Sequence, residues 1–179
     1  MFPFIQKTSI RFPEPPLFIP MQIQIIATGK IKERYISDGI AEYGKRLRPY
    51  VKLRVTEVDD DRRPASISPA QQDQILAREG EKILAAIPEG SVTVALAVDG
   101  KPYSSEELAA FMKKREVSGA SQITFIIGGD LGLAPSVLER CDLVLSLSPM
   151  TFTHPMVRLI LLEQVYRAFR IMRGEPYHK

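Results

Sequence analysis

The chain has 179 residues, of which 45% are hydrophobic and 25% charged. This length predicts one domain with a core of its own, and the composition excludes a disordered or fibrous protein. No run of eighteen uncharged apolar residues occurs, which argues against a membrane-spanning helix. The single cysteine, Cys141, excludes an intramolecular disulfide and suits a reducing cytoplasm. With only His154 and His178 beside it, one chain cannot assemble a zinc-type ligand cluster.

The positive charge of the chain is concentrated at its C-terminus. The formal net charge is +3; residues 1–20 carry +1 and the last thirteen residues +3, which leaves 21–166 with −1. A local basic segment of this kind indicates contact with a polyanion such as RNA. A solvated tail with scattered arginines is the alternative interpretation.

Alternating strands and helices are predicted from residue 21 onward. Residues 1–20 contain five prolines, which break helices and central strands, so we expect an extension outside the fold. Strands are predicted over 21–28, 51–58, 92–98, 123–127 and 143–147. Helices are predicted over 34–47, 69–87, 105–114, 135–140 and 155–172.

Local signals fix several boundaries of these elements. Ser68 with Gln71, and Ser104 with Glu107, form capping boxes before two of the helices. Asp99-Gly100 is a turn signal that should end the third strand. The alternation predicts an α/β domain with a mainly parallel sheet and helices on both faces. Ligands of such sheets bind at the carboxyl ends of the strands, where the loops 128–133 and 148–154 lie.

The glycine loop Gly128-Gly129-x-x-Gly132 follows a buried strand. Glycines there permit positive φ and a close approach of backbone amides to a ligand. The spacing is neither the dinucleotide fingerprint nor a P-loop. A ligand-binding loop and a simple tight turn both remain open.

The segment 145–155 ends a strand and enters the last helix, with Pro155 expected at the first helical position. Its mixture of polar and apolar residues without periodicity suits the wrapping of an adenine and its ribose. His154 is a candidate functional residue here, and a capping or packing histidine is the competing interpretation.

The last helix is apolar over most of its surface, which predicts an enclosed core position or a subunit interface. Arg167 could pair with Glu163 in the favourable i,i+4 order, or could contact an anion or a carbonyl near a target base. The cluster Asp59–Asp61 is a weaker candidate for a metal site, and a charged flexible loop is the simpler interpretation. Cys141 has no obvious base nearby and is interpreted as a buried structural thiol.

Taken together, the motifs resemble the RlmH family of SPOUT-class methyltransferases. The resemblance covers residues 21–179. The residues that carry it are Leu96, Gly100-Lys101, Ser105-Glu106, Ile127-Gly128-Gly129-x-x-Gly132-Leu133, Leu145-Ser146-Leu147-Ser148, Thr151-x-x-His154-Pro155, Arg158, Glu163-Gln164-x-Tyr166-Arg167-Ala168 and Pro176-Tyr177-His178-Lys179.

This resemblance implies a fold and a reaction. The family fold is an α/β sheet with a C-terminal trefoil knot, here formed by 128–133, 148–154 and the last helix, and the family works as a homodimer in the cytoplasm. Its members use S-adenosylmethionine, without a metal, to methylate N3 of a pseudouridine in 23S rRNA on the assembled ribosome. The cofactor contacts carried over are Leu96, Gly128, Leu147, Ser148, Pro149, Met150, Thr151 and Phe152.

The resemblance also assigns RNA and catalytic residues. Contacts to RNA or the target base are expected from His154, Arg167, Tyr177, His178 and Lys179. Arg167, together with His154 or His178, is expected to stabilise negative charge that develops on the uracil ring. One departure is Ala97, where some relatives carry an acidic residue, so a cofactor contact at that position is in doubt. A non-catalytic RNA-binding protein and another nucleotide-binding α/β enzyme are the two alternatives.

Overall fold

The structure, a computed structural model, describes residues 21–61, 66–119 and 122–177. The predicted extension 1–20 therefore lies outside the described residues, as do His178 and Lys179. The five strands are β1 (Gln22–Thr28), β2 (Lys52–Val58), β3 (Val92–Pro102), β4 (Gln122–Ile127) and β5 (Leu143–Ser146). The five helices are α1 (Arg34–Leu47), α2 (Pro69–Ala86), α3 (Ser105–Val117), α4 (Pro135–Arg140) and α5 (His154–Met172).

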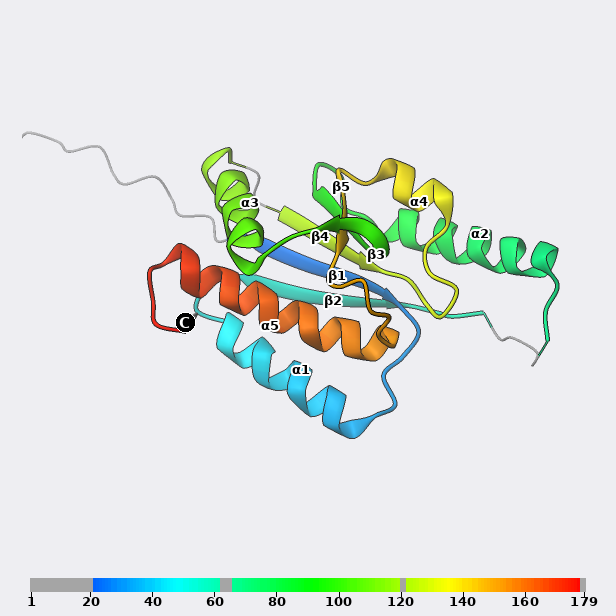
Figure 1. Cartoon of the computed structure of the whole chain (residues 1–179), viewed down its shortest axis with the longest axis horizontal. Helices are drawn as coiled ribbons and strands as arrows, with labels where there is room; N and C mark the ends of the chain where they lie inside the picture. Colours follow the sequence, from blue (N-terminus) through cyan, green and yellow to red (C-terminus); the bar gives the residue numbers. More distant parts are fainter. Residues whose placement is uncertain (1–20, 62–65, 120–121, 178–179) are drawn as a thin grey trace, which may run out of the picture.

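The strands form one sheet in the order β2-β1-β4-β3-β5, and every pair is parallel (Figure 1). The central strands β1 and β4 are buried along nearly their whole length, as expected when both faces of a parallel sheet are covered. The predicted α/β class with a parallel sheet is confirmed.

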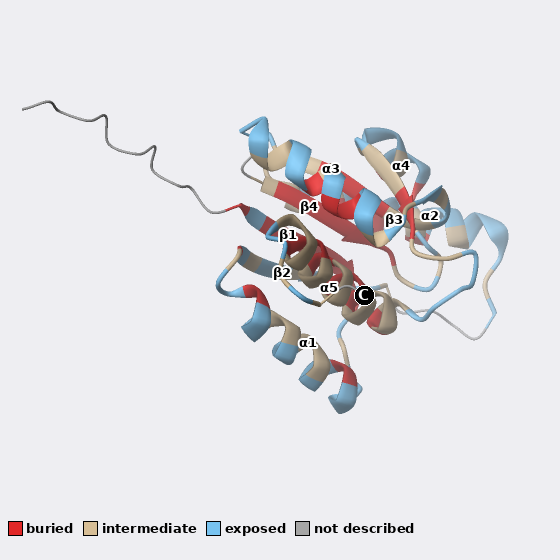
Figure 2. Cartoon of the chain, turned by 60° about the vertical axis from the view of Figure 1, so that its left-hand side comes forward, coloured by how far each residue is buried: buried red, intermediate tan, exposed pale blue. Residues whose placement is uncertain are grey.

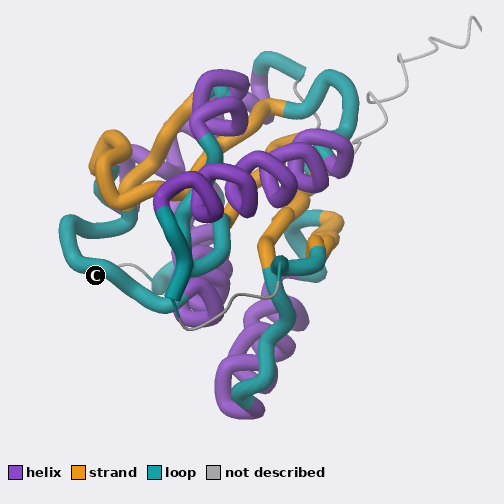
Figure 3. The backbone as a smooth tube through the Cα atoms, turned by 90° about the vertical axis from the view of Figure 1, so that its right-hand side faces the viewer, coloured by secondary structure: helices purple, strands orange, loops and turns teal. Residues whose placement is uncertain are grey.

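Helices cover both faces of the sheet, and each face has its own core (Figure 3). Ile23, Ile25 and Phe125 pack on the side of α1, α3 and α5. Ile26 and Ile126 point the other way, towards α2 and α4, because successive side chains of a strand alternate between faces. Figure 2 shows the buried strands between helices whose outward faces are exposed.

The third strand is longer than the sequence predicts. The expected turn at Asp99-Gly100 does not end it, because β3 continues to Pro102. Both Leu96 and Lys101 are in register with Leu145 of β5, so the chain leaves the sheet after Leu96 and rejoins it at Lys101. Residues 97–100 therefore form a bulge at the carboxyl end of the sheet, which we call the β3 bulge.

The last helix buries one face against the rest of the domain, and its remaining residues are partly exposed. Its buried residues include Leu161, Leu162, Val165 and Phe169, and it packs against α1, α3 and the sheet. It begins at His154, one residue earlier than predicted, a difference within the ordinary uncertainty of helix ends. Within the described ranges, no helix is both long enough and apolar enough to cross a membrane.

Both predicted capping boxes are confirmed. Ser68 accepts a hydrogen bond from the backbone N–H of Gln71, and the Gln71 side chain accepts one from the backbone N–H of Ser68.

Replacing Ser68 by alanine should lower the free energy of unfolding by about 1 kcal/mol, because the cap acceptor is lost. Urea denaturation measures this, and Ser68→Asp, which keeps an acceptor, should stay within about 0.5 kcal/mol of the wild type. Equal losses in the two variants would contradict the capping role.

Candidate active site

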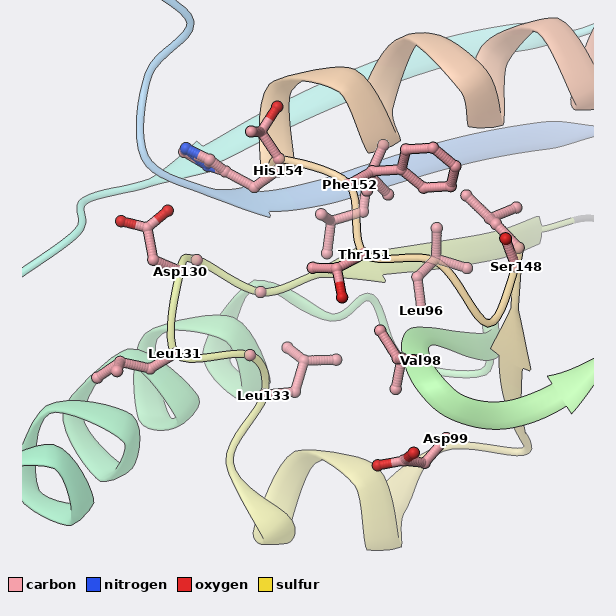
Figure 4. A pocket seen from close by; sticks show the side chains of 18 of the residues that line it. Leu96, Val98, Asp99, Asp130, Leu131, Leu133, Ser148, Thr151, Phe152 and His154 are labelled. Carbon is pink, nitrogen blue, oxygen red and sulfur yellow. The ribbon is translucent and has the colours of Figure 1, made fainter. Parts of the chain in front are cut away.

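A cavity of about 640 Å³ opens at the carboxyl ends of the strands. Its volume lies within the range typical of small-molecule sites. The glycine loop 128–133, the loop 147–154 and the β3 bulge line it, so both predicted ligand loops meet at one place (Figure 4). Its apolar wall includes Leu96, Ile127, Leu133, Leu138 and Val157.

The glycine loop turns tightly on itself beside the cavity. The backbone N–H of Gly132 donates to the carbonyl oxygen of Gly129 over 3.0 Å, and Gly132 has a positive φ of 83°. A Cβ at Gly128 would overlap the carbonyl oxygen of Gly132 and lie 2.5 Å from its carbonyl carbon. Only glycine fits at residue 128, because the backbone of Gly132 occupies the space that a side chain would need.

Local hydrogen bonds shape the loop after β5. The Ser146 hydroxyl donates to the carbonyl oxygen of Ser148 over 3.1 Å, and the Ser148 hydroxyl accepts from the backbone N–H of Met150 over 3.0 Å. Leu147, Ser148, Met150, Thr151 and Phe152 line the cavity, whereas Pro149 does not. Met150 is 71% exposed, so the rim of the site carries an apolar side chain that faces solvent.

His154 is the first residue of α5 and lies at one end of the cavity, on the same side as Asp130 (Figure 4). Its Nδ1 is buried, with no hydrogen-bond partner among the described residues. Burial and, secondarily, the positive charge of Arg158 hold the pKa of His154 below its ordinary value; Asp130 and Asp60 act weakly in the opposite direction. The imidazole is therefore favoured in its neutral form.

Arg158 lies one helical turn after His154 and is only 1% exposed. Its guanidinium donates to the carbonyl oxygens of Thr28 and Gly29, over 2.7 and 2.6 Å, and forms an ion pair of 2.8 Å with Glu57. These contacts join the start of α5 to the carboxyl ends of β1 and β2. They hold His154 against Gly29, where an added Cβ would lie 3.4 Å from the imidazole Cε1.

Arg167 is paired within its own helix and does not line the cavity. Its Nε donates to Glu163 over 3.0 Å, and its guanidinium stacks 4.7 Å from the ring centre of Tyr177. The predicted i,i+4 pair is thus present. Arg167 lies thirteen positions after His154 in the same helix, a distance of about 20 Å along the axis at the usual rise.

The C-terminal tail folds back on α5 and α1. The Tyr177 hydroxyl donates to Glu163 over 3.2 Å, and its ring packs edge-on against Tyr166. Glu175 accepts from the Tyr50 hydroxyl and forms an ion pair of 2.6 Å with Arg170. Burial is the main reason that the pKa of Tyr177 lies above its ordinary value, so its hydroxyl stays protonated.

The structure divides the predicted site residues into two groups. Leu96, Gly128, His154 and most of the loop 147–152 surround one cavity, whereas Arg167 and Tyr177 lie together at the far end of α5. Sequence reasoning missed Val98, Asp99, Leu138 and Val157 as lining residues. The Asp99-Gly100 turn signal marked the segment that leaves the sheet, but nothing in the sequence placed it beside the glycine loop.

The other charged cluster considered in the sequence has a structural role. Asp61 forms ion pairs with Arg78 and Lys82, which lower the pKa of its carboxyl group. Among the described residues, no group of three His, Cys, Asp or Glu side chains could hold a metal ion.

Cys141 is half-buried, and burial raises the pKa of its thiol, which keeps the thiol protonated and unreactive.

Comparison with known families identifies this arrangement. Residues 21–178 match the family model described as "Predicted SPOUT methyltransferase". The chain belongs to the SPOUT methyltransferase family. It is an α/β methyltransferase, and the cavity at the carboxyl ends of its strands is the candidate site of methyl transfer.

Curated relatives match over their entire length. The chain is 56% identical, over 159 residues, to a protein of Carboxydothermus hydrogenoformans named ribosomal RNA large subunit methyltransferase H, covering 89% of this chain and 100% of the relative. It is 54% identical to a protein of the same name from Halothermothrix orenii, with the same coverage.

Among solved structures, a probable methyltransferase from Bordetella pertussis aligns with a TM-score of 0.50 and 14% identity, covering 83% of this chain and 96% of that one. This likeness supports the fold alone. The SPOUT family implies a trefoil knot, and its three predicted parts, 128–133, 148–154 and α5, adjoin one another around the cavity. The knot itself stays a prediction.

Proposed function

We propose that the protein transfers a methyl group from S-adenosylmethionine to N3 of a pseudouridine in 23S rRNA, on the assembled ribosome in the cytoplasm. The observation that carries this proposal is the 56% identity, over a relative's full length, to a ribosomal RNA large subunit methyltransferase H. In the reaction a bond forms between N3 and the methyl carbon while the carbon–sulfur bond breaks. The N3 proton is lost, and S-adenosylhomocysteine is the second product.

The cavity fits S-adenosylmethionine by size and by chemistry. Its apolar wall suits the adenine, and the glycine loop 128–133 forms one side of the cavity. The residues that would hold the cofactor are Leu96, Gly128, Leu147, Ser148, Met150, Thr151 and Phe152; Pro149, which the family resemblance also suggested, does not line the cavity. S-adenosylmethionine supplies a methyl group on a sulfonium, a good leaving group, so the protein's main task is in-line positioning of the two reactants.

We assign charge stabilisation at the target base to Arg167 and His154. A neutral imidazole can donate one hydrogen bond to a uracil carbonyl, and a guanidinium can stabilise negative charge on the ring. Because about 20 Å of helix separates these two side chains, one chain cannot bring both to one base. The proposed site is therefore completed by Arg167 of a second copy, which requires a homodimer.

The tail is the proposed RNA-binding element. Tyr177, which precedes His178 and Lys179 in the sequence, is held beside Arg167. The basic C-terminus identified from the charge distribution would then contact rRNA phosphates close to the target base.

Incorporation of label from methyl-labelled S-adenosylmethionine into ribosomes from a strain that lacks this modification tests the proposed reaction. Mass mapping should identify the product as 3-methylpseudouridine. Cofactor binding without methyl transfer would show that the substrate is wrong. The absence of both binding and transfer would favour a non-catalytic RNA-binding protein.

Replacing Arg167 by alanine should lower kcat on ribosomes by about 100- to 1,000-fold, the usual cost of losing a donor to developing negative charge. The Kd for S-adenosylmethionine should not change, because Arg167 does not line the cavity. Single-turnover kinetics and calorimetry measure the two quantities. Lys114→Ala, which removes a cation in the last turn of α3, is the control and should leave kcat unchanged. Full turnover by Arg167→Ala would refute the assignment.

Co-expression of Arg167→Ala and His154→Ala chains with different tags tests the composite site. Each homodimer lacks one of the two groups at every site, whereas a heterodimer has one site with both groups intact. Random pairing should therefore restore about a quarter of wild-type activity, because half the dimers are mixed and half of their sites are complete. Activity in the mixture no greater than that of the separate variants would show that both groups act within one chain, or that one of them does not act.

A further inference from the structure

The β3 bulge brings the carboxylate of Asp99 to the cavity. Asp99 is not among the site residues that the family resemblance implies. Leu96 and Lys101 are both in register with Leu145, so the four residues between them project from the sheet edge. Ala97, Val98 and Asp99 line the cavity as a result (Figure 4). The alanine methyl at residue 97 offers no polar contact, whereas the side chain two residues later is a carboxylate.

The bulge is held firmly to the neighbouring strand. A Cβ at Gly100 would lie 2.6 Å from the carbonyl carbon of Leu145 and 2.8 Å from the backbone nitrogen of Ser146. Glycine at this position lets the chain return directly onto β5. Asp99, immediately before this close contact, therefore projects from an anchored segment rather than from a loose loop.

The side chain of Asp99 is not held by any neighbouring side chain or backbone group among the described residues. Among the described residues, no hydrogen bond or ion pair involves its side chain, and the residue is exposed at the cavity. The other acidic lining residue, Asp130, lies at the opposite end of the cavity beside His154 (Figure 4). The two carboxylates are therefore separated, and Asp99 lies away from the end assigned to the target base.

A carboxylate at this position is suited to bind the ribose of the cofactor. A ribose presents two neighbouring hydroxyl donors, and an ionised carboxylate has two acceptor oxygens. An acidic side chain near the carboxyl end of a parallel strand binds ribose hydroxyls in the same way in dinucleotide-binding folds. The apolar wall of the same cavity includes Leu133 and Leu138, which would take the adenine.

We propose that Asp99 accepts hydrogen bonds from the ribose hydroxyls of S-adenosylmethionine. The inference rests on the proposed function, because it presupposes this cofactor in this cavity. Asp99 is thus a cofactor-binding residue that selects for an intact ribose.

Calorimetry with S-adenosylhomocysteine and its 2′-deoxyribose analogue tests the assignment without requiring turnover. The wild type should bind S-adenosylhomocysteine about 10-fold more tightly than the analogue, the scale of one charge-assisted hydrogen bond. Asp99→Ala should weaken binding of S-adenosylhomocysteine by about 10- to 100-fold and should bind the two ligands equally. Asp99→Asn, which keeps one acceptor oxygen, should lose less affinity than Asp99→Ala.

The control is Asp73→Ala, which removes an exposed carboxylate from α2 and should retain the wild-type preference. An Asp99→Ala protein that discriminates between the two ligands as strongly as the wild type would overturn the ribose assignment, whatever its overall affinity. If the wild type binds S-adenosylmethionine but shows no ribose preference, the inference fails and the proposed function stands. If the wild type binds neither S-adenosylmethionine nor S-adenosylhomocysteine, both fail.

Discussion

Gly128→Ala should abolish measurable binding of S-adenosylmethionine, a loss of at least about 100-fold in affinity. The added methyl would overlap the carbonyl oxygen of Gly132, and it would meet backbone that no side-chain rotation can move. The glycine loop must then open, which removes the backbone surface that faces the cofactor. The same overlap should lower the free energy of unfolding by about 3 kcal/mol, the upper range for overpacking. Calorimetry and urea denaturation measure the two effects.

Gly44→Ala is the matched control for this substitution. Gly44 lies within α1, and a Cβ there would meet only the Leu53 side chain, at 4.0 Å. The control should retain full cofactor affinity and gain about 0.5–1 kcal/mol of stability, because alanine loses less backbone entropy than glycine on entering a helix. Wild-type affinity in Gly128→Ala would show that the glycine loop does not form the cofactor site.

Arg158→Ala should lower the free energy of unfolding by about 3–5 kcal/mol, the usual cost of removing one partner of a buried charged network. The side chain is fully buried, and its loss would leave the carbonyl oxygens of Thr28 and Gly29 without their donor. Urea denaturation measures the loss. Glu57→Gln should cost less, about 1 kcal/mol, because the Glu57 side chain is 37% exposed and an amide oxygen still accepts from Arg158.

A second measurement separates the electrostatic role of Arg158 from its packing role. The positive charge of Arg158 lowers the pKa of His154, so Arg158→Ala should raise that pKa towards its ordinary value. The chain has two histidines, which makes their assignment by proton NMR direct. A change in unfolding free energy below about 1 kcal/mol, with an unmoved His154 pKa, would contradict both roles.

The order of strands and helices was predictable because the sequence patterns that mark them are local. The isoleucine-rich run in 21–28 and the capping boxes at Ser68 and Ser104 depend only on near neighbours in sequence. The carboxyl end of β3 was predicted wrongly for the opposite reason. Asp99-Gly100 does leave the sheet, but the return at Lys101 depends on its pairing with Leu145, which lies 44 residues later in the sequence.

The candidate site was predictable in part. Loops that follow parallel strands must meet at one edge of the sheet, which placed the segments 128–133 and 148–154 correctly. The position of Asp99 in the cavity lining was not predictable from spacing. Nor was the buried position of Arg158, because an arginine in a helix normally lies at the surface. The roles of His154, Arg167 and the cofactor contacts stay predictions until the proposed variants are measured.

The C-terminal tail packs against several of the chain's tyrosines, so its position affects the intrinsic fluorescence of the protein. The chain has six tyrosines and no tryptophan, so tyrosine dominates its intrinsic fluorescence. Tyr43, Tyr50, Tyr166 and Tyr177 all lie in the contact between the tail, α1 and α5. Release of the tail would remove Tyr177 from Tyr166 and Arg167, and Glu175 from Tyr50, so the emission would change. Release of the tail can therefore be followed in the unlabelled protein, and an affinity tag belongs at the opposite terminus.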